Sequence, residues 1–119
     1  MIYLLDTVAL IRHFSGNKNI GKEARKLLNS IDSTDTKFAI SIISLMEIMY
    51  LNERKRIDIE LESTINLLLN NSAYNIVELN SEIVITAAKI KFYELHDRMI
   101  LATAKWLDIP IISSDKKIC

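Results

Sequence analysis

The sequence is poor in the residues that cross-link, bend or loosen a chain. Its single cysteine, Cys119, allows no internal disulfide and no cysteine-rich metal site, which is typical of proteins from a reducing compartment. One proline and two glycines among 119 residues exclude a flexible linker and a glycine-rich phosphate loop, and no internal repeat is evident. The fold must therefore be held by a packed core.

Long apolar runs and net charge are missing as well. No stretch reaches the roughly 18 apolar residues that a membrane span needs, and the amino terminus lacks the basic region and apolar segment of a secretion signal. Lys plus Arg and Asp plus Glu number 15 each, so no overall field attracts a polyanion. We expect a cytoplasmic protein that binds any nucleic acid through a local patch or a metal ion.

Apolar residues are abundant, at half of the chain. A chain of this length can build one core but not two, so residues 1–119 are expected to form a single domain. The periodicity predicts strands at 2–6, 38–43, 76–79 and 110–113, and helices at 7–14, 20–31, 44–55, 58–69, 80–90 and 97–107. This alternation predicts right-handed crossovers, and hence a three-layer α/β/α sandwich around a central parallel sheet of four strands.

The first strand is the clearest element of this pattern. Four apolar residues at 2–5 run directly into Asp6, and such a run is typical of a strand that is buried on both faces. Ligands of open α/β sheets bind beyond the carboxyl ends of the strands, which is where Asp6 stands. Taken alone, Asp6 could equally cap the helix that follows.

Four carboxylates occupy boundaries of this kind. Asp6 ends the first strand and Asp115 follows the last, while Glu47 lies in the first turn of one helix and Asp97 opens another. If the first and last strands are adjacent at the centre of the sheet, the four acids share one pocket, where their repulsion requires a cation. Oxygen ligands suit Mg²⁺ or Mn²⁺, and such a site supports metal-assisted hydrolysis of phosphodiesters.

Structural roles compete for several of these residues. Ser44-Leu45-Met46-Glu47 has the pattern of a capping box, in which the glutamate bonds to the start of its own helix. Thr7 and Ser113 could bond to the backbone at the ends of their elements. These alternatives stay open on the sequence alone.

The basic and imidazole side chains are weaker candidates. Arg98 could touch a phosphate, although a solvated arginine at a helix start is the commoner case. His13 and His96 lack a second histidine at ligand spacing and are left out of the predicted site. The basic run at 53–56 is expected to be solvated rather than to contact RNA.

Four segments occur in a characteristic order: Leu4-Leu5-Asp6-Thr7-Val8-Ala9-Leu10-Ile11, then Ser44-x-x-Glu47, then Ala87-Ala88, and last Asp97-Arg98-Met99-Ile100-Leu101-Ala102-Thr103-Ala104 leading to Ser113-Ser114-Asp115. In this order they resemble a PIN domain, of the compact kind found in VapC-type toxins. The resemblance covers nearly the whole chain, and its most specific parts are the block from Asp97 to Asp115 and the start at Asp6.

The resemblance implies an Mg²⁺- or Mn²⁺-dependent endoribonuclease. Its acidic set would be Asp6, Glu47, Asp97 and Asp115, which would serve both as catalytic residues and as metal ligands. Thr7 and Ser113 would support them through their hydroxyl groups. The resemblance also implies an RNA substrate, a homodimer and an antitoxin partner, but it names neither the RNA target nor the number of metal ions.

The chain departs from the family pattern in two places. Ile48-Met49-Tyr50 stands where a glycine often follows the position of Glu47. Many relatives also add a strand after the last aspartate, whereas this sequence stops four residues beyond Asp115, so a fifth strand stays open. Neither departure removes an acid.

Two other functions compete with a nuclease. A haloacid-dehalogenase-type phosphatase would need a second aspartate at position 8, where Val8 stands. A PIN-like scaffold that binds RNA or protein without cutting would be favoured by the loss of an acid, and all four are present.

Overall fold

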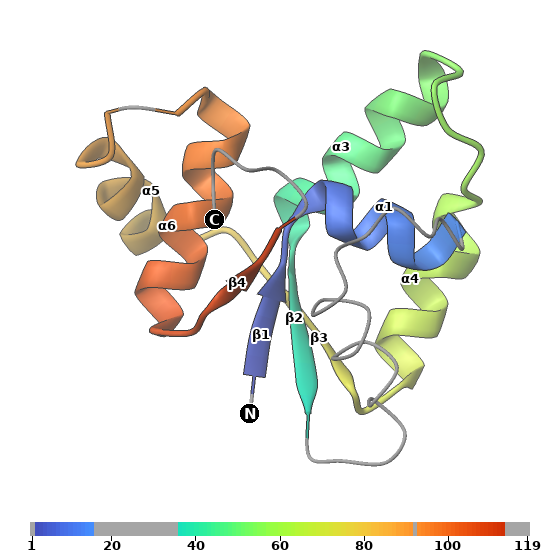
Figure 1. Cartoon of the computed structure of the whole chain (residues 1–119), viewed down its shortest axis with the longest axis horizontal. Helices are drawn as coiled ribbons and strands as arrows, with labels where there is room; N and C mark the ends of the chain where they lie inside the picture. The colour runs from blue at the N-terminus through green and yellow to red at the C-terminus, as the bar shows by residue number, and fades with distance from the viewer. Residues whose placement is uncertain (1, 16–35, 92, 114–119) are drawn as a thin grey trace.

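A computed structural model of the chain describes residues 2–15, 36–91 and 93–113 (Figure 1). The elements, in chain order, are β1 (Ile2–Leu5), α1 (Thr7–Ser15), β2 (Lys37–Ser41), α3 (Ile42–Glu53), α4 (Leu61–Asn70), β3 (Tyr74–Val77), α5 (Ser81–Ala88), α6 (Leu95–Leu107) and β4 (Ile111–Ile112). The helix predicted at 20–31 and the acid Asp115 lie outside the described residues. None of the described helices has the length and apolarity needed to cross a membrane.

The four strands form one parallel sheet in the order β3-β2-β1-β4. The prediction of a four-stranded parallel sheet is confirmed, and the first and last strands are adjacent, as the shared pocket of acids requires. Their common place at the centre is wrong, because β1 and β2 are central while β4 lies at the edge of the described sheet. The apolar pair Ile111–Ile112 that forms β4 fits either position, so its composition could not decide between them.

Helices cover both faces of the sheet (Figure 1). Consecutive side chains of a strand point to opposite faces, and both Leu4 and Leu5 of β1 are fully buried. Leu4 packs in a core cluster with residues of α5 and α6, whereas Leu5 packs with residues of α1, α3 and α4. The predicted three-layer α/β/α sandwich is therefore confirmed.

Several predicted boundaries are wrong by a few residues. The second strand ends at Ser41, whose hydroxyl accepts a hydrogen bond from the amide of Ile43 at 3.1 Å and so caps α3. Ile42 and Ile43 belong to the helix, although their β-branched side chains suited the strand equally well. The third strand runs from Tyr74 to Val77 rather than over 76–79, and it follows at once on the turn after α4.

Capping residues and buried side chains define the starts and inner faces of the later helices. Asn80 caps α5 by accepting a hydrogen bond from the amide of Ile83 at 2.9 Å. On α4, Leu68 is buried, but Leu69, which continues the apolar run, is 66% exposed. The last helix begins at Leu95 with Glu94 as its cap, so Asp97 lies within its first turn instead of opening it.

Candidate functional site

Asp6 stands at the carboxyl end of β1 and is 2% exposed. Its Oδ1 accepts a hydrogen bond from the amide of Ala9 at 2.8 Å, so it caps α1. Its Oδ2 accepts a hydrogen bond from the hydroxyl of Ser113. The backbone amide of Asp6 also donates to the carbonyl of Ile112 at 3.0 Å, which holds the end of β4 beside it. The cap and the contact with Ser113 therefore coexist, because each uses a different oxygen.

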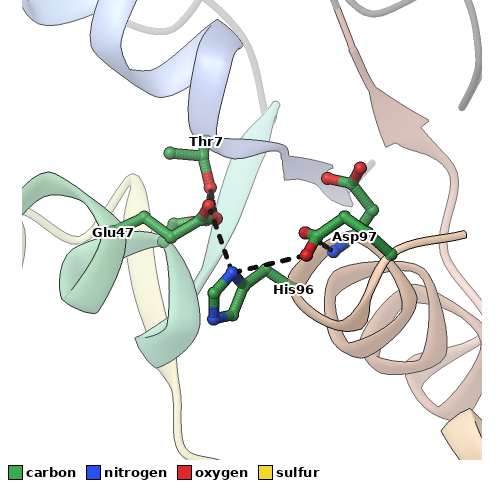
Figure 2. A network of polar contacts seen from close by, with 6 residues as sticks. Thr7, Glu47, His96 and Asp97 are labelled. Carbon is green, nitrogen blue, oxygen red and sulfur yellow. Dashed lines mark hydrogen bonds and ion pairs between the residues drawn. The ribbon is translucent and has the colours of Figure 1, made fainter. Parts of the chain in front are cut away.

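Glu47 lies in the second turn of α3 and points toward Thr7 at the start of α1 (Figure 2). The hydroxyl of Thr7 donates to Glu47 Oε1 at 2.6 Å, and the same hydroxyl oxygen lies 3.0 Å from that of Ser44. The predicted capping box is wrong, because α3 has already begun at Ile42 and Ser44 is buried inside it. The carboxylate of Glu47 therefore points to Thr7 rather than to the start of its own helix.

The start of α6 brings further polar groups to this carboxylate (Figure 2). His96 Nδ1 lies 3.9 Å from Glu47 Oε2 and 3.6 Å from Glu94 Oε2. Glu94 itself caps α6 through the amide of Asp97 at 3.1 Å. One ligand atom from each of Glu47, Glu94 and His96 can be chosen so that all three lie within 4.8 Å of one another.

Electrostatics around Glu47 follow from this packing. Burial, the largest effect, raises the pKa of Glu47, while the hydrogen bond from Thr7 and the nearby His96 lower it. The charges of Asp97 and Glu94 raise the same pKa, so both carboxylates act on Glu47 in the folded chain. A partly buried carboxylate with acidic neighbours is the situation that a bound cation relieves.

Three of the predicted acids belong to segments that contact one another: Asp6 directly precedes α1, Glu47 lies on α3, and Asp97 lies on α6. The hydroxyl of Thr7, the residue after Asp6, bonds to Glu47, and the charge of Asp97 acts on Glu47 from α6. Thr7 and Ser113, the predicted supporting hydroxyls, both contact carboxylates of this set. Asp115 lies outside the described residues.

Two residues near Glu47 were missed from the sequence. His96 was left out and Glu94 was not considered, because their place depends on how α6 packs against α3. The only available signal was that His96 directly precedes Asp97.

Arg98 and His13, which were weighed from the sequence, bond to groups other than the predicted acids. Arg98 Nη1 donates to the carbonyl of Ile90 at 3.0 Å, and its buried Nε has no hydrogen-bond partner among the described residues. Arg98 is therefore not the solvated side chain suggested by its place at a helix start. His13 Nε2 lies 2.8 Å from the hydroxyl of Tyr74, and burial lowers the pKa of His13.

Comparison with known proteins adds a family and several structures. The model of the PIN domain family matches residues 3–119. A toxin–antitoxin complex from Klebsiella pneumoniae has a chain 26% identical to this one, with a TM-score of 0.68 over 97% of this chain and 88% of that chain. VapBC2 from Rickettsia felis, bound to a DNA fragment from its promoter, is 18% identical with a TM-score of 0.71, over 98% and 90%.

A third similar structure is VapBC-1 from nontypeable Haemophilus influenzae. It is 17% identical with a TM-score of 0.64, over 99% of this chain and 90% of that chain. The two structures below 25% identity bear on the fold alone. A search of curated proteins gives no significant match.

Proposed function

Because this chain belongs to the PIN-domain family, we propose that it is a metal-dependent endoribonuclease. The observation that carries the proposal is the hydrogen bond from Thr7 to Glu47, which joins the end of β1 to α3 beside Asp6. Asp97 acts on the same carboxylate from α6. If the three acids converge as we propose, their mutual repulsion would be costly unless they hold a cation.

The chemistry of these acids fits a hard divalent ion. We assign Asp6, Glu47, Asp97 and Asp115 as ligands of Mg²⁺ or Mn²⁺, which prefer carboxylate oxygens. When bound, such an ion polarises a phosphodiester and lowers the pKa of a water molecule. Thr7 fixes the carboxylate of Glu47, and Ser113 fixes that of Asp6. These two hydroxyls would keep the acids oriented while the substrate enters.

We further propose that the protein is the toxin of a toxin–antitoxin pair, with an antitoxin protein and a second copy of itself as partners. Support comes from the Klebsiella pneumoniae toxin–antitoxin complex, whose similarity spans 97% of this chain. The pairing can be examined in the genome: a short upstream reading frame encoding a DNA-binding protein would support it. The alternative is a PIN-like scaffold that binds RNA or protein without cutting.

The nuclease proposal is tested by cleavage of single-stranded RNA in the presence of Mg²⁺ or Mn²⁺. We expect cleavage by the wild type, none in excess EDTA, and a loss in Asp6→Asn greater than the roughly 10- to 100-fold typical of a supporting residue. Asparagine retains an oxygen that can accept from the amide of Ala9, so circular dichroism should show an intact fold. Asp108→Asn, at an exposed position after α6, is the matched control and should cleave normally.

Two results would reject the nuclease mechanism. Cleavage that persists in EDTA and in Asp6→Asn would remove the metal centre from the reaction. A folded wild type that binds RNA and never cuts it would favour the scaffold.

A further inference from the structure

Helix α3 connects the acids to an exposed aromatic and basic surface. Tyr50 and Arg54 follow Glu47 by three and seven positions, so all three residues share one side of the helix. Tyr50 is 54% exposed and Arg54 is also exposed. At a rise of 1.5 Å per residue, Arg54 lies about 10 Å along the helix from Glu47. A strand of nucleic acid leaving the acids along this side would meet Tyr50 first.

Tyr50 and Arg54 form a stacked pair. The guanidinium carbon of Arg54 lies 5.7 Å from the centre of the Tyr50 ring, within the range of a cation–π contact. An exposed ring beside a fixed positive charge is the combination with which proteins bind single-stranded nucleic acid, since a base stacks on the ring and a phosphate pairs with the cation.

The turn that follows α3 adds two more positive charges. Arg54, Lys55 and Arg56 are all exposed, and in the described part of the chain no carboxylate forms an ion pair with them. Lys55 and Arg56 line an open hollow of about 430 Å³ together with Asn52, Ile57 and Asp58.

The shape of this turn is set by the chain itself. The side-chain amide of Asn52 donates to the carbonyl of Ile59 at 2.6 Å, and Asn52 Oδ1 accepts from the amide of Ile59 at 3.1 Å. Lys55 adopts a left-handed backbone with φ of 58°. The positive charges are therefore presented by a turn whose two ends are tied together, which reduces the ordering needed to bind a phosphate.

We propose that Tyr50, Arg54 and the basic turn 54–56 form a subsite for single-stranded RNA, in which one base stacks on Tyr50 and phosphates pair with the cations. The inference rests on the proposed nuclease function and extends it to substrate binding. Since the chain has a formal net charge of zero, a local patch is needed to hold a polyanion. Tyr50, Arg54 and the basic turn provide such a patch on the same side of α3 as Glu47.

The test measures binding separately from cleavage. The Asp6→Asn protein serves as the parent, and the probe is a fluorescein-labelled single-stranded RNA of mixed sequence and about 12 nucleotides, followed by fluorescence anisotropy. Loss of one stacked base should weaken binding about tenfold in Tyr50→Ala, whereas Tyr50→Phe keeps the ring and should bind like the parent. Arg54→Gln should reduce the slope of log K against log salt by about 0.7 for each phosphate that the variant no longer binds.

A matched control and three possible results decide whether the subsite exists. Lys105→Gln removes an exposed charge from α6 and should change neither affinity nor salt slope. Affinities and slopes of Tyr50→Ala and Arg54→Gln equal to those of the parent would overturn the inference, as would a parent that does not bind the probe. Sedimentation that changes in Tyr50→Ala without a change in RNA affinity would assign this surface to a second copy and also overturn it.

These outcomes separate the subsite from the nuclease. If wild type cleaves RNA while the variants bind normally, only the subsite is wrong. If the parent binds through this surface but wild type never cleaves, only the nuclease is wrong.

Discussion

At the scale of single residues, Thr7 connects two parts of the molecule that are far apart in the chain. Its hydroxyl reaches from the start of α1 to Glu47 on α3, and Ser44 lies against the same oxygen. The bond orients one oxygen of Glu47, while the other faces His96 across 3.9 Å. One oxygen of Glu47 therefore has a hydroxyl donor as its neighbour, and the other has an imidazole ring.

The protonation of Glu47 should be detectable as a pH-dependent difference in melting temperature between wild type and Glu47→Gln. Burial raises the pKa of Glu47 above its ordinary value of 4.5, so the folded state binds a proton more readily than the unfolded state. Stability is therefore lost as pH rises through the folded pKa, and the charged group is a penalty at neutral pH. Without metal, Glu47→Gln should melt a few degrees higher than wild type at pH 7, and this difference should disappear below about pH 4.5.

Thermal scans with and without Mn²⁺ complete this experiment. Metal at about a hundred times its dissociation constant should stabilise wild type by roughly 2.7 kcal/mol and should shift Glu47→Gln much less. Glu78→Gln, at an exposed position after β3, is the matched control and should respond like wild type. A Glu47→Gln protein that melts lower at pH 7, together with a wild type that ignores Mn²⁺, would make Glu47 a structural residue.

Sequence reasoning singled out Asp6, Glu47 and Asp97 as candidates because each stands near the end of a recognisable element. It missed Glu94 and His96, which come near Glu47 only through the packing of α6 beside α3. The competing roles were also settled by contacts: Asp6 does cap a helix, whereas Glu47 does not belong to a capping box. A one-dimensional pattern contains no information about which of two possible partners a side chain will choose.

At the scale of elements, α6 shows how both ends of a helix are fixed. Glu94 caps its first turn. At its other end Asp108 adopts a left-handed backbone with φ of 54°, and the amides of Asp108 and Ile109 donate to the carbonyls of Lys105 and Ala104. This is a Schellman termination, in which glycine is the usual residue.

Asp108→Gly should therefore stabilise the protein. Glycine adopts this conformation without the roughly 1–2 kcal/mol that a left-handed backbone costs other residues, although aspartate tolerates it and the unfolded chain gains entropy. The net gain should be below about 1 kcal/mol, seen as a melting temperature a few degrees higher. Asp108→Ala, which has neither advantage, should melt lower than wild type. A lower melting temperature for Asp108→Gly would mean that the aspartate side chain stabilises the end of α6.

Element boundaries were the weaker part of the prediction. The strand–helix alternation was recognisable from apolar periodicity, but Ile42 and Ile43 fit a strand as well as a helix, and only the bond from Ile43 to Ser41 marks the change. Similarly, Leu69 continued an apolar run and yet is exposed, because consecutive residues of a helix point about 100° apart and Leu68 is the one that faces the core.

At the scale of the whole molecule, the described helices leave large apolar side chains on the surface. They include Met46 and Met49 on α3, Val84 and Ile85 on α5, and Leu95 on α6. Exposed apolar area of this kind commonly marks an interface, and closed twofold pairs are the commonest soluble assembly.

Sedimentation velocity at concentrations of about 10 µM should therefore show a homodimer. The reason is the removal of these side chains from water at a shared surface. A monomer at this concentration, in the presence and absence of divalent ions, would contradict the proposed self-association.

The layered parallel-sheet architecture could be predicted from the sequence, whereas the order of the strands could be predicted only in part. Buried apolar strands separated by helices allow few topologies, and the observed parallel sheet between two helical layers is the expected one. The order of the strands was only partly predictable. Strand β4 consists of Ile111 and Ile112, which pair with Leu4 and Leu5 of β1. Nothing in these two apolar residues indicates that the strand is short or that it lies at the edge of the described sheet.

The two carboxylate oxygens of Asp6 bind different partners, which restricts rotation of this side chain. One oxygen is held by the amide of Ala9 at the start of α1 and the other by the hydroxyl of Ser113 after β4. The plane of the carboxylate is thus fixed by three elements at the moment they assemble. An incoming ligand meets a group whose torsional entropy was already lost during folding, so the orientation of Asp6 is a property of the fold rather than a response to binding.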